Sequence, residues 1–328
     1  MKAIFFIPDF QERVWGGKKL STVLKKEIPY EHTGESWEIA CHANGQSVVR
    51  EGEYQGLSFE ELLVQQGERV IGKAFSKGDR FPLLIKFIDA MEKLSVQVHP
   101  EDAYAKIHEH GELGKSECWY IIEAEEGAKL VAGLKDGVTK ELFEQKVKEN
   151  RLEEVLHEVE VKAGDVLDIP AGLIHAIGDG ILLAEVQQNS DTTYRVYDWG
   201  RVGLDGKPRD LHLRQSLEVS DFEQKHSKEL VQGIKTRIGK NQITHFIKNS
   251  YFTLKELRLE ESFDVERREG NFEIYICVSG GGQIQYKDGE VQEIVLGDSF
   301  LMPYESEAFS FLPKEGSLIL LKTFVEEE

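Results

Sequence analysis

The chain has 328 residues and carries 40 lysines and arginines against 59 aspartates and glutamates, a formal net charge of −19. So acidic a chain lacks the basic surface that displaces counterions from nucleic-acid phosphates or binds anionic lipids. We therefore expect no nucleic-acid partner and no membrane partner. With 40% hydrophobic and 30% charged residues, the composition is that of an ordinary globular protein, and the length allows two domains.

No targeting segment or disulfide framework is expected. The opening apolar run, residues 3–7, ends at Pro8 and is too short for a secretory or membrane segment. The three cysteines, Cys41, Cys118 and Cys277, are scattered and form no CxxC pair. Both features favour a reducing, cytoplasmic location.

The elements expected along the chain are mostly strands. Residues 58–73 predict a helix, because Ser58 and Glu61 form a capping box before apolar residues at helical spacing. Residues 101–110 predict a second helix, and residues 139–158 a helical insertion with apolar residues repeated among charges. Short β-type runs between turn signals predict antiparallel strands at residues 83–88, 94–98, 119–122, 166–169, 272–278 and 317–321.

One internal repeat indicates two copies of a β unit. Residues 164–170 and residues 297–303 both read Gly-Asp, four residues, then Pro, and both follow a β-rich stretch. Five residues beyond the proline the first copy has His175, whereas the second has Ala308. We therefore expect a metal-binding domain at residues 1–220 and a degenerate domain without metal ligands at residues 221–328.

The first copy also contains a recognisable motif. The pattern G-x5-P-x-G-x2-H in residues 164–175 resembles the second motif of the cupin superfamily. That resemblance implies a mainly β fold with two cupin-type (double-stranded β-helix, jelly-roll) barrels and a small helical insertion. Upstream, Gln97 and His99 lie two residues apart in a strand, as do Lys115 and Glu117, so each pair projects from one strand face.

Together with His175, these residues make a candidate ligand set. Gln97, His99, Glu117 and His175 offer an amide oxygen, two imidazoles and a carboxylate. A mixed nitrogen and oxygen set of this kind suits a borderline divalent ion, with a position left for water or substrate, as in catalytic zinc sites.

Six motifs then occur in order between about residues 10 and 200. They are Trp15-Gly16-Gly17, Gly34-Glu35-Ser36-Trp37-Glu38, Gln97-Val98-His99-Pro100, Gly114-Lys115-Ser116-Glu117-Cys118-Trp119-Tyr120, Pro170-Ala171-Gly172-Leu173-Ile174-His175 and Ser190-Asp191-Thr192-Thr193-Tyr194-Arg195. In this order they resemble type I mannose-6-phosphate isomerase, in the short form of Gram-positive bacteria. The resemblance implies an isomerase that interconverts mannose 6-phosphate and fructose 6-phosphate and holds one Zn²⁺ on Gln97, His99, Glu117 and His175. It also implies a catalytic arginine at Arg195.

Aldose–ketose isomerisation through a cis-enediol requires a base, a cation near the developing oxyanion and a group that binds the phosphate. Arg195 is our candidate for the oxyanion. Lys115 and Lys86 are candidates for the phosphate, since Lys86 stands in an apolar strand where burial is costly without an anion. Trp15 is a candidate substrate contact, although composition alone favours a core role.

The base is left open by the sequence. A glutamate ten residues before the arginine is implied by the family resemblance, which places it at Glu185, and Asp191 is the competitor. Arg195 has an alternative as a structural arginine paired with Asp191 or Asp198.

Other functions are also left open. The alternatives are a different cupin enzyme such as an iron dioxygenase, a divergent cupin that acts on or binds another phosphosugar, and a non-catalytic sugar sensor. Dioxygenase cupins usually show HxH, where this chain has Gln97, and a sensor would be expected to lose metal ligands. The expected partner is a small phosphorylated sugar, and the expected state is a monomer or weak homodimer.

Overall fold

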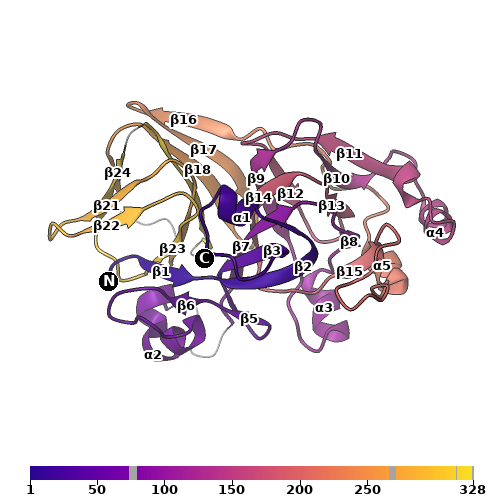
Figure 1. Ribbon diagram of the computed structural model, residues 1–328, viewed down its shortest axis with the longest axis horizontal. Coiled ribbons are helices and arrows are strands. Elements are labelled where there is room, and N and C mark those ends of the chain that lie inside the picture. The colour runs from indigo at the N-terminus through magenta and orange to yellow at the C-terminus, as the bar shows by residue number, and fades with distance from the viewer. Residues whose placement is uncertain (74–79, 266–270, 315, 327–328) are drawn as a thin grey trace.

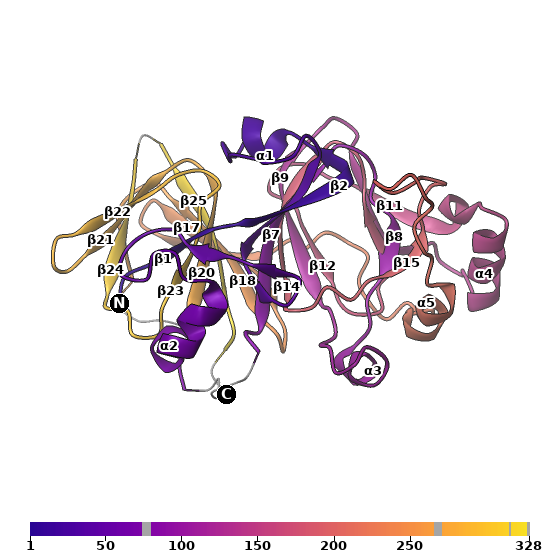
Figure 2. The same ribbon diagram turned by 60° about the horizontal axis from the view of Figure 1, so that its bottom comes forward.

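The computed structural model describes residues 1–73, 80–265, 271–314 and 316–326. Within these ranges the strands pair antiparallel, which confirms the mainly β fold class. Figure 1 shows two β-rich halves side by side, the first with magenta strands and the second with orange and yellow strands. Figure 2 shows the same two halves after a rotation, with the indigo strand β1 lying in the second half.

The first half contains two sheets among the described residues. The larger runs in the order β12 (Val166–Ile169), β9 (Glu117–Ala124), β14 (Ile181–Gln188), β7 (Leu83–Ala90), β2 (Asp9–Gly17) and β3 (Thr33–Ile39). The smaller runs in the order β11 (Leu156–Glu160), β10 (Lys129–Leu134), β13 (His175–Ile177), β8 (Val96–Val98) and β15 (Tyr194–Tyr197).

The second half repeats this arrangement, again counted over the described residues. Its large sheet runs in the order β16 (Ile234–Ile238), β17 (Asn241–Lys248), β18 (Thr253–Leu259), β25 (Leu318–Phe324), β20 (Glu273–Ser279), β23 (Ser299–Met302), β1 (Ile4–Ile7) and β6 (Val48–Val49). Its small sheet is β19 (Phe263–Val265), β24 (Phe309–Pro313), β21 (Gly282–Tyr286) and β22 (Val291–Ile294). Strands β4 (Cys41–His42) and β5 (Gly45–Gln46) form a separate pair. The division of the chain at residue 220 stays a prediction, with β1 and β6 joining the second large sheet.

The helices lie outside the sheets (Figures 1 and 2). They are α1 (Lys19–Thr22), α2 (Phe59–Ile71), α3 (Asp102–His108), α4 (Lys140–Lys148), the 3₁₀ turn η1 (Leu152–Val155) and α5 (Leu213–Val219). The capping box predicted for α2 is present, with Ser58 Oγ accepting from the Glu61 N–H and the Glu61 carboxylate accepting from the Ser58 N–H. Within the described ranges, no helix is both long and apolar enough to cross a lipid bilayer.

The predicted helical insertion at residues 139–158 is wrong in its second half. Helix α4 ends at Lys148, and Asn150 turns the chain with a φ of 55°, in the left-handed region that ends helices. The chain continues through η1 into β11, which pairs with β10. The apolar residues after Lys148 pack instead against the outer face of the small sheet, and the charges between them alternate with period two along β11.

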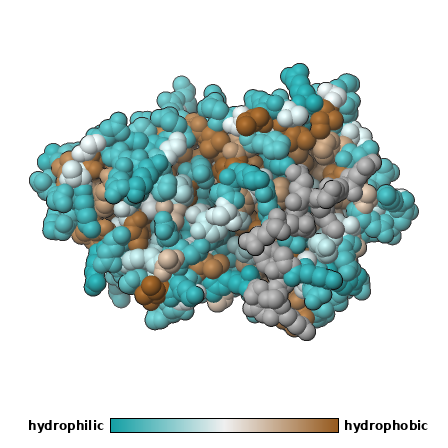
Figure 3. Space-filling view, turned by 180° about the vertical axis from the view of Figure 1, so that it is seen from behind, coloured by the Kyte–Doolittle hydropathy of each residue, from teal (hydrophilic) through white to brown (hydrophobic). Residues whose placement is uncertain are grey.

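The two large sheets pack face to face, and their central strands are therefore buried on both sides. Every residue of β7 and β14 is buried. One face, with Phe87 and Val186, joins the core between the halves, and the other, with Ile88 and Leu183, faces the lumen of the first half. This double burial explains why apolar residues dominate both strands, with Lys86 and Glu185 as charged exceptions that face the cavity. On the face seen in Figure 3, hydrophilic residues cover most of the surface.

The internal repeat is present in the structure. Gly164 and Gly297 both have φ near +90°, at 90° and 87°, a conformation that glycine adopts without strain. In each copy the following aspartate accepts a main-chain N–H from three residues earlier at 2.9 Å, Lys162 to Asp165 and Val295 to Asp298. The strands β12 and β23 then begin at equivalent positions.

Candidate metal centre and active-site cavity

The alternation predicted for residues 95–99 is borne out by the burial of β8. Val96 and Val98 are fully buried in the core outside the small sheet, so Gln97 projects from the opposite face, towards the lumen. Gln97 lies directly opposite His175 across the β8–β13 pair. His99 follows β8 and is 1% exposed.

The two histidines point the same ring nitrogen at each other. His99 Nδ1 lies 2.9 Å from the carbonyl of Thr192, and His175 Nδ1 lies 2.8 Å from the carbonyl of Leu173. These contacts favour the tautomer that donates from Nδ1, which leaves a lone pair on each Nε2. The two Nε2 atoms are 3.1 Å apart. Two facing lone pairs at this distance repel each other unless a cation lies beside them.

Glu117 and Lys115 complete the cluster. Each Nε2 lies 3.5 Å from a different Glu117 carboxylate oxygen, and the Lys115 ammonium contacts both Glu117 and His99 Nε2, the latter at 3.1 Å. Burial, then the charge of Lys115, lowers the pKa of His99 to about 3. Burial opposes ionisation of Glu117, but Lys115 and the histidines hold the pKa of that carboxyl well below its usual range.

This cluster fits a divalent cation. Among the described residues, His99, Glu117 and His175 form the one group of three His, Cys, Asp or Glu side chains whose ligand atoms lie within 4.8 Å of one another. Neutral imidazoles and an ionised carboxylate are the protonation states that metal binding requires. Glu117 Oε1 is buried without a hydrogen-bond partner, and the ammonium of Lys115 shows that the space between the ligands attracts positive charge.

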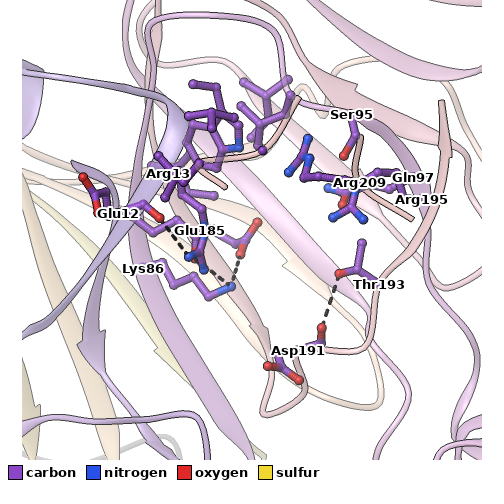
Figure 4. A pocket seen from close by; sticks show the side chains of 18 of the residues that line it. Glu12, Arg13, Lys86, Ser95, Gln97, Glu185, Asp191, Thr193, Arg195 and Arg209 are labelled. Carbon is purple, nitrogen blue, oxygen red and sulfur yellow. Dashed lines mark hydrogen bonds and ion pairs between the residues drawn. The ribbon is translucent and has the colours of Figure 1, made fainter. Parts of the chain in front are cut away.

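A cavity of about 660 Å³ opens in front of the cluster. Figure 4 shows Arg13, Lys86 and Glu185 on one wall, and Gln97 and Arg195 on the other. The lining brings together the predicted site residues Trp15, Lys86, Gln97, Lys115, Glu185, Asp191 and Arg195. The cluster residues His99, Glu117 and His175 lie behind this lining, at 1% exposure or less.

Glu185 is held next to the cluster by two contacts. Its Oε2 accepts the indole N–H of Trp119 at 2.8 Å, and its Oε1 lies 3.2 Å from Lys86 Nζ. The Trp119 ring in turn packs edge-on against His175, with ring centroids 5.4 Å apart. Lys86 is thus buried with a carboxylate partner, and its ammonium also lies over the ring of Trp37.

Arg195 and Asp191 lie near the mouth of the cavity. The acids proposed as structural partners of Arg195 are engaged elsewhere, because Asp198 pairs with Arg201 and Arg209 and Asp191 accepts from Asn44 at 2.6 Å. Arg195 donates to the main-chain carbonyl of Asp210 at 3.0 Å. Burial, then the neighbouring Arg209, lowers the pKa of Arg195.

Trp15 is buried in the core and also faces the cavity, so its contact with substrate stays a prediction. The side chain is 3% exposed and packs in the lumen core, yet it also lines the cavity. The described residues of the insertion at 139–158 are absent from the lining. The mouth is bordered instead by the segment between β15 and α5, through Gly203, Leu204 and Asp205.

One ion pair in the cavity wall was missed from the sequence. Arg13 Nε lies 2.8 Å from Glu35 Oε1, and the indole N–H of Trp37 donates to Glu35 Oε2 at 2.7 Å. Burial alone raises the pKa of Glu35, but Arg13 and Lys86 outweigh it and lower that pKa to about 2. The period-two spacing of Arg13 with Trp15, and of Glu35 with Trp37, was the available signal.

The second half has a different set of residues at the equivalent positions. Glu273 pairs with the residue before Pro303 just as Glu117 pairs with the residue before Pro170, so the two glutamates correspond. Glu273, however, lies 2.8 Å from the ammonium of Lys322 and accepts the Tyr275 hydroxyl at 2.7 Å. Its carboxylate is therefore already neutralised by a lysine.

Two family models match the chain. Residues 4–145 match the model described as phosphomannose isomerase type I, catalytic domain, and residues 242–321 match the mannose-6-phosphate isomerase cupin domain. The second match supports the predicted cupin fold.

Individual relatives agree with the family models. The chain is 42% identical over 302 residues to mannose-6-phosphate isomerase ManA of Bacillus subtilis, covering 92% of this chain and 93% of that one. It is 35% identical to the mannose-6-phosphate isomerase of Streptococcus mutans, covering 99% and 98%. The crystal structure of the mannose 6-phosphate isomerase from Bacillus subtilis superposes with a TM-score of 0.91 at 33% identity, covering 99% of this chain and all of that one. The chain belongs to the type I mannose-6-phosphate isomerase family.

Proposed function

We propose that this chain interconverts mannose 6-phosphate and fructose 6-phosphate through a cis-enediol, with one Zn²⁺ held by Gln97, His99, Glu117 and His175. The observation that carries the proposal is the buried His–Glu–His cluster behind a polar cavity, in a chain of this family. The bound ion would supply a Lewis acid for the sugar oxygens at the reacting carbons.

The base in this proposal is Glu185. Isomerisation moves a proton from C2 of the open aldose to C1, so one carboxylate must accept it and return it. Glu185 lines the cavity next to the cluster, and Trp119 and Lys86 hold its two oxygens in place. Asp191 is fixed at the rim by Asn44, and its side chain is 36% exposed. Burial against the cluster supports Glu185 over Asp191.

Cationic side chains would hold the oxyanion and the phosphate. Arg195 has its guanidinium in the cavity without a carboxylate in ion-pair range among the described residues, so its charge remains available to a developing enediolate. Lys86 and Lys115 are the proposed phosphate contacts. Each is already paired, with Glu185 and Glu117, so an incoming phosphate would compete with an existing ion pair.

Solvent exchange of the C2 proton tests the base. In Glu185→Gln we expect exchange and turnover to fall by about 10²–10⁴-fold, because the amide cannot accept the proton. Asp191→Asn is the matched control, since it makes the same chemical change at the rim, and we expect a much smaller loss. Exchange at the wild-type rate in Glu185→Gln would transfer the role away from Glu185.

Metal content tests the remaining part of the proposal. We expect the purified chain to carry close to one Zn²⁺, and we expect a chelator to abolish turnover and added Zn²⁺ to restore it. Gln97→Ala should weaken metal binding. Full activity in both the chelated chain and Gln97→Ala would contradict a zinc-dependent isomerase.

A further inference from the structure

The carboxylate of Asp102, at the start of α3, fastens the backbone next to the metal ligands. Its Oδ1 accepts the main-chain N–H of Gly114 at 2.7 Å and the side-chain amide of Gln188 at 3.0 Å. The amide oxygen of Gln188 in turn accepts the main-chain N–H of Ser116 at 2.8 Å. The backbone on both sides of residue 115 is therefore held, directly or through one side chain, by a single carboxylate.

Gly114 and Lys115 also pack closely against residues 100–102, which follow His99 at the end of β8. A methyl group on Gly114 would lie 2.4 Å from the main-chain nitrogen of Asp102, so only glycine permits this approach. The N–H of Lys115 donates to the carbonyl of Pro100, the residue after His99, at 3.0 Å. The segment that leads into the carboxylate ligand is thus fastened to the segment that follows the histidine ligand.

The other oxygen of Asp102 is bound from the second half of the chain. Oδ2 accepts the hydroxyl of Tyr251 at 2.9 Å, from the turn between β17 and β18. That turn is well fixed, because Asn249 Oδ1 accepts the N–H groups of Tyr251 and Phe252 at 2.9 Å each, and Phe252 is 1% exposed in the core between the halves. Burial, then the bond to Asp102, raises the pKa of Tyr251 to about 12, so the phenol donates at neutral pH.

We propose that Asp102 and Tyr251 are positioning residues for the metal ligands, and that the second half of the chain stabilises the metal centre through their hydrogen bond. The inference rests on the proposed function, because it gives these residues a task towards the zinc site. Within the described ranges, no residue beyond His212 lines the cavity. The described part of the second half therefore contacts the site only indirectly, through the hydrogen bond from Tyr251 to Asp102.

A carboxylate with a hydrogen-bond partner on only one of its two oxygens can rotate more freely. Without the Tyr251 hydroxyl, Asp102 Oδ2 would turn towards water, and the bonds from Oδ1 to Gly114 and Gln188 would weaken. The Glu117 segment would then sample more positions relative to His99, and a ligand set that is less well held loses its metal faster.

Release of Zn²⁺ to an excess of a chromophoric chelator tests this directly. Groups that hydrogen-bond directly to ligands are worth about 10–100-fold in metal affinity, whereas Tyr251 acts through Asp102 and the backbone, so we expect Tyr251→Phe to release Zn²⁺ only about 3–10-fold faster. We expect kcat for mannose 6-phosphate to fall by a similar factor, with KM unchanged within about twofold, because the change does not reach the substrate contacts.

Tyr120→Phe is the matched control. The Tyr120 hydroxyl is more deeply buried than that of Tyr251 and also bridges the halves, donating to Glu256 Oε2 at 2.7 Å. Its loss leaves the bonds from Asp102 to Gly114 and Gln188 intact. Both variants lose one such bond, so both should lower the melting temperature, whereas only Tyr251→Phe should accelerate metal release.

Substitutions of Asp102 provide a second, graded test. Asp102→Asn keeps one oxygen for Gly114 and Gln188, so its release rate should lie between those of the wild type and Asp102→Ala. Release at the wild-type rate in both Tyr251→Phe and Asp102→Asn would overturn the inference, as would equal acceleration in Tyr120→Phe.

The outcomes also separate this inference from the proposed function. A wild-type chain that binds no Zn²⁺ overturns both. A wild-type chain that binds Zn²⁺ but does not turn over mannose 6-phosphate overturns the proposed function, while the release rates still decide whether Tyr251 and Asp102 position the ligands.

Discussion

The ionised carboxylate of Glu35, in the cavity wall, should stabilise the folded chain by an amount that depends on pH. Its carboxylate is bound by Arg13 at 2.8 Å and by the indole of Trp37 at 2.7 Å, and Lys86 lies 4.0 Å away. Burial alone would raise its pKa, but Arg13 and Lys86 lower it from the ordinary 4.5 to about 2. The Glu35 side chain is 13% exposed, so solvent screens these charges little.

The size of this contribution follows from linkage. At about 1.4 kcal/mol per pH unit, a pKa lowered from 4.5 to about 2 corresponds to about 3 kcal/mol of stability. Because the folded-state pKa is the lower one, the contribution is fully present above pH 4.5. It is lost as the pH falls towards 2, and about half remains at pH 3.

Glu35→Gln should therefore lower the free energy of unfolding by about 3 kcal/mol at pH 7, and by progressively less below pH 4.5. Urea denaturation of the chelator-treated chain at pH 7, 4.5 and 3.5 measures this deficit without interference from metal loss. Glu12→Gln is the matched control, since Glu12 is exposed on the neighbouring strand β2, next to Arg13, and lines the same cavity. Its effect should stay within about 0.5 kcal/mol at every pH.

Two results would refute the reasoning. Equal deficits for Glu35→Gln and Glu12→Gln would show that the ion pair with Arg13 contributes nothing beyond surface electrostatics. A Glu35→Gln deficit that stays constant down to pH 3.5 would show that the pKa of Glu35 is not lowered in the folded chain.

Two further predictions concern the catalytic cation and the second half. Arg195→Lys keeps the charge but loses the planar guanidinium that donates to the Asp210 carbonyl. We therefore expect kcat in a coupled isomerase assay to fall by about 10–100-fold. An unchanged kcat would show that Arg195 takes no part in the chemistry. Ala308→His introduces the histidine that the second copy lacks. We expect the metal content to stay at one ion per chain, because Lys322 already neutralises the carboxylate of Glu273. Two ions per chain would contradict this expectation.

Local patterns predicted those parts of the fold that depend on nearby residues. The helix α2 begins where its capping box is, and the strand β12 covers the predicted range 166–169, because caps and alternation act over a few residues. The insertion at 139–158 failed for a tertiary reason. Its later apolar residues satisfied a helical spacing in the sequence, but pairing of β11 with β10 and a left-handed Asn150 overrode that preference.

In the candidate site, too, local patterns predicted some features, whereas others depend on tertiary packing. Alternation along β8 predicted the direction of Gln97, and the spacing of Lys115 with Glu117 predicted that they lie close together, although His99 follows β8 and Lys115 precedes β9. The partners that support them come from distant segments, such as Glu35 for Arg13 and Tyr251 for Asp102, 22 and 149 residues apart. No short-range pattern encodes these pairings, because the first depends on the pairing of β2 with β3 and the second on how the two halves pack against each other.

The net charge of −19 makes long-range attraction of an anionic sugar unfavourable, so the cavity must attract it at short range. Most cations of the cavity wall are already matched with carboxylates, Arg13 with Glu35 and Lys86 with Glu185. Such pairs balance the charge of the cavity wall, and in the proposed function a cation would exchange its carboxylate for a phosphate only at contact distance, where the dielectric is low. Selectivity for a small phosphorylated ligand over larger polyanions then follows from the buried position of these pairs, because a polyanion would meet the acidic surface before it reached them.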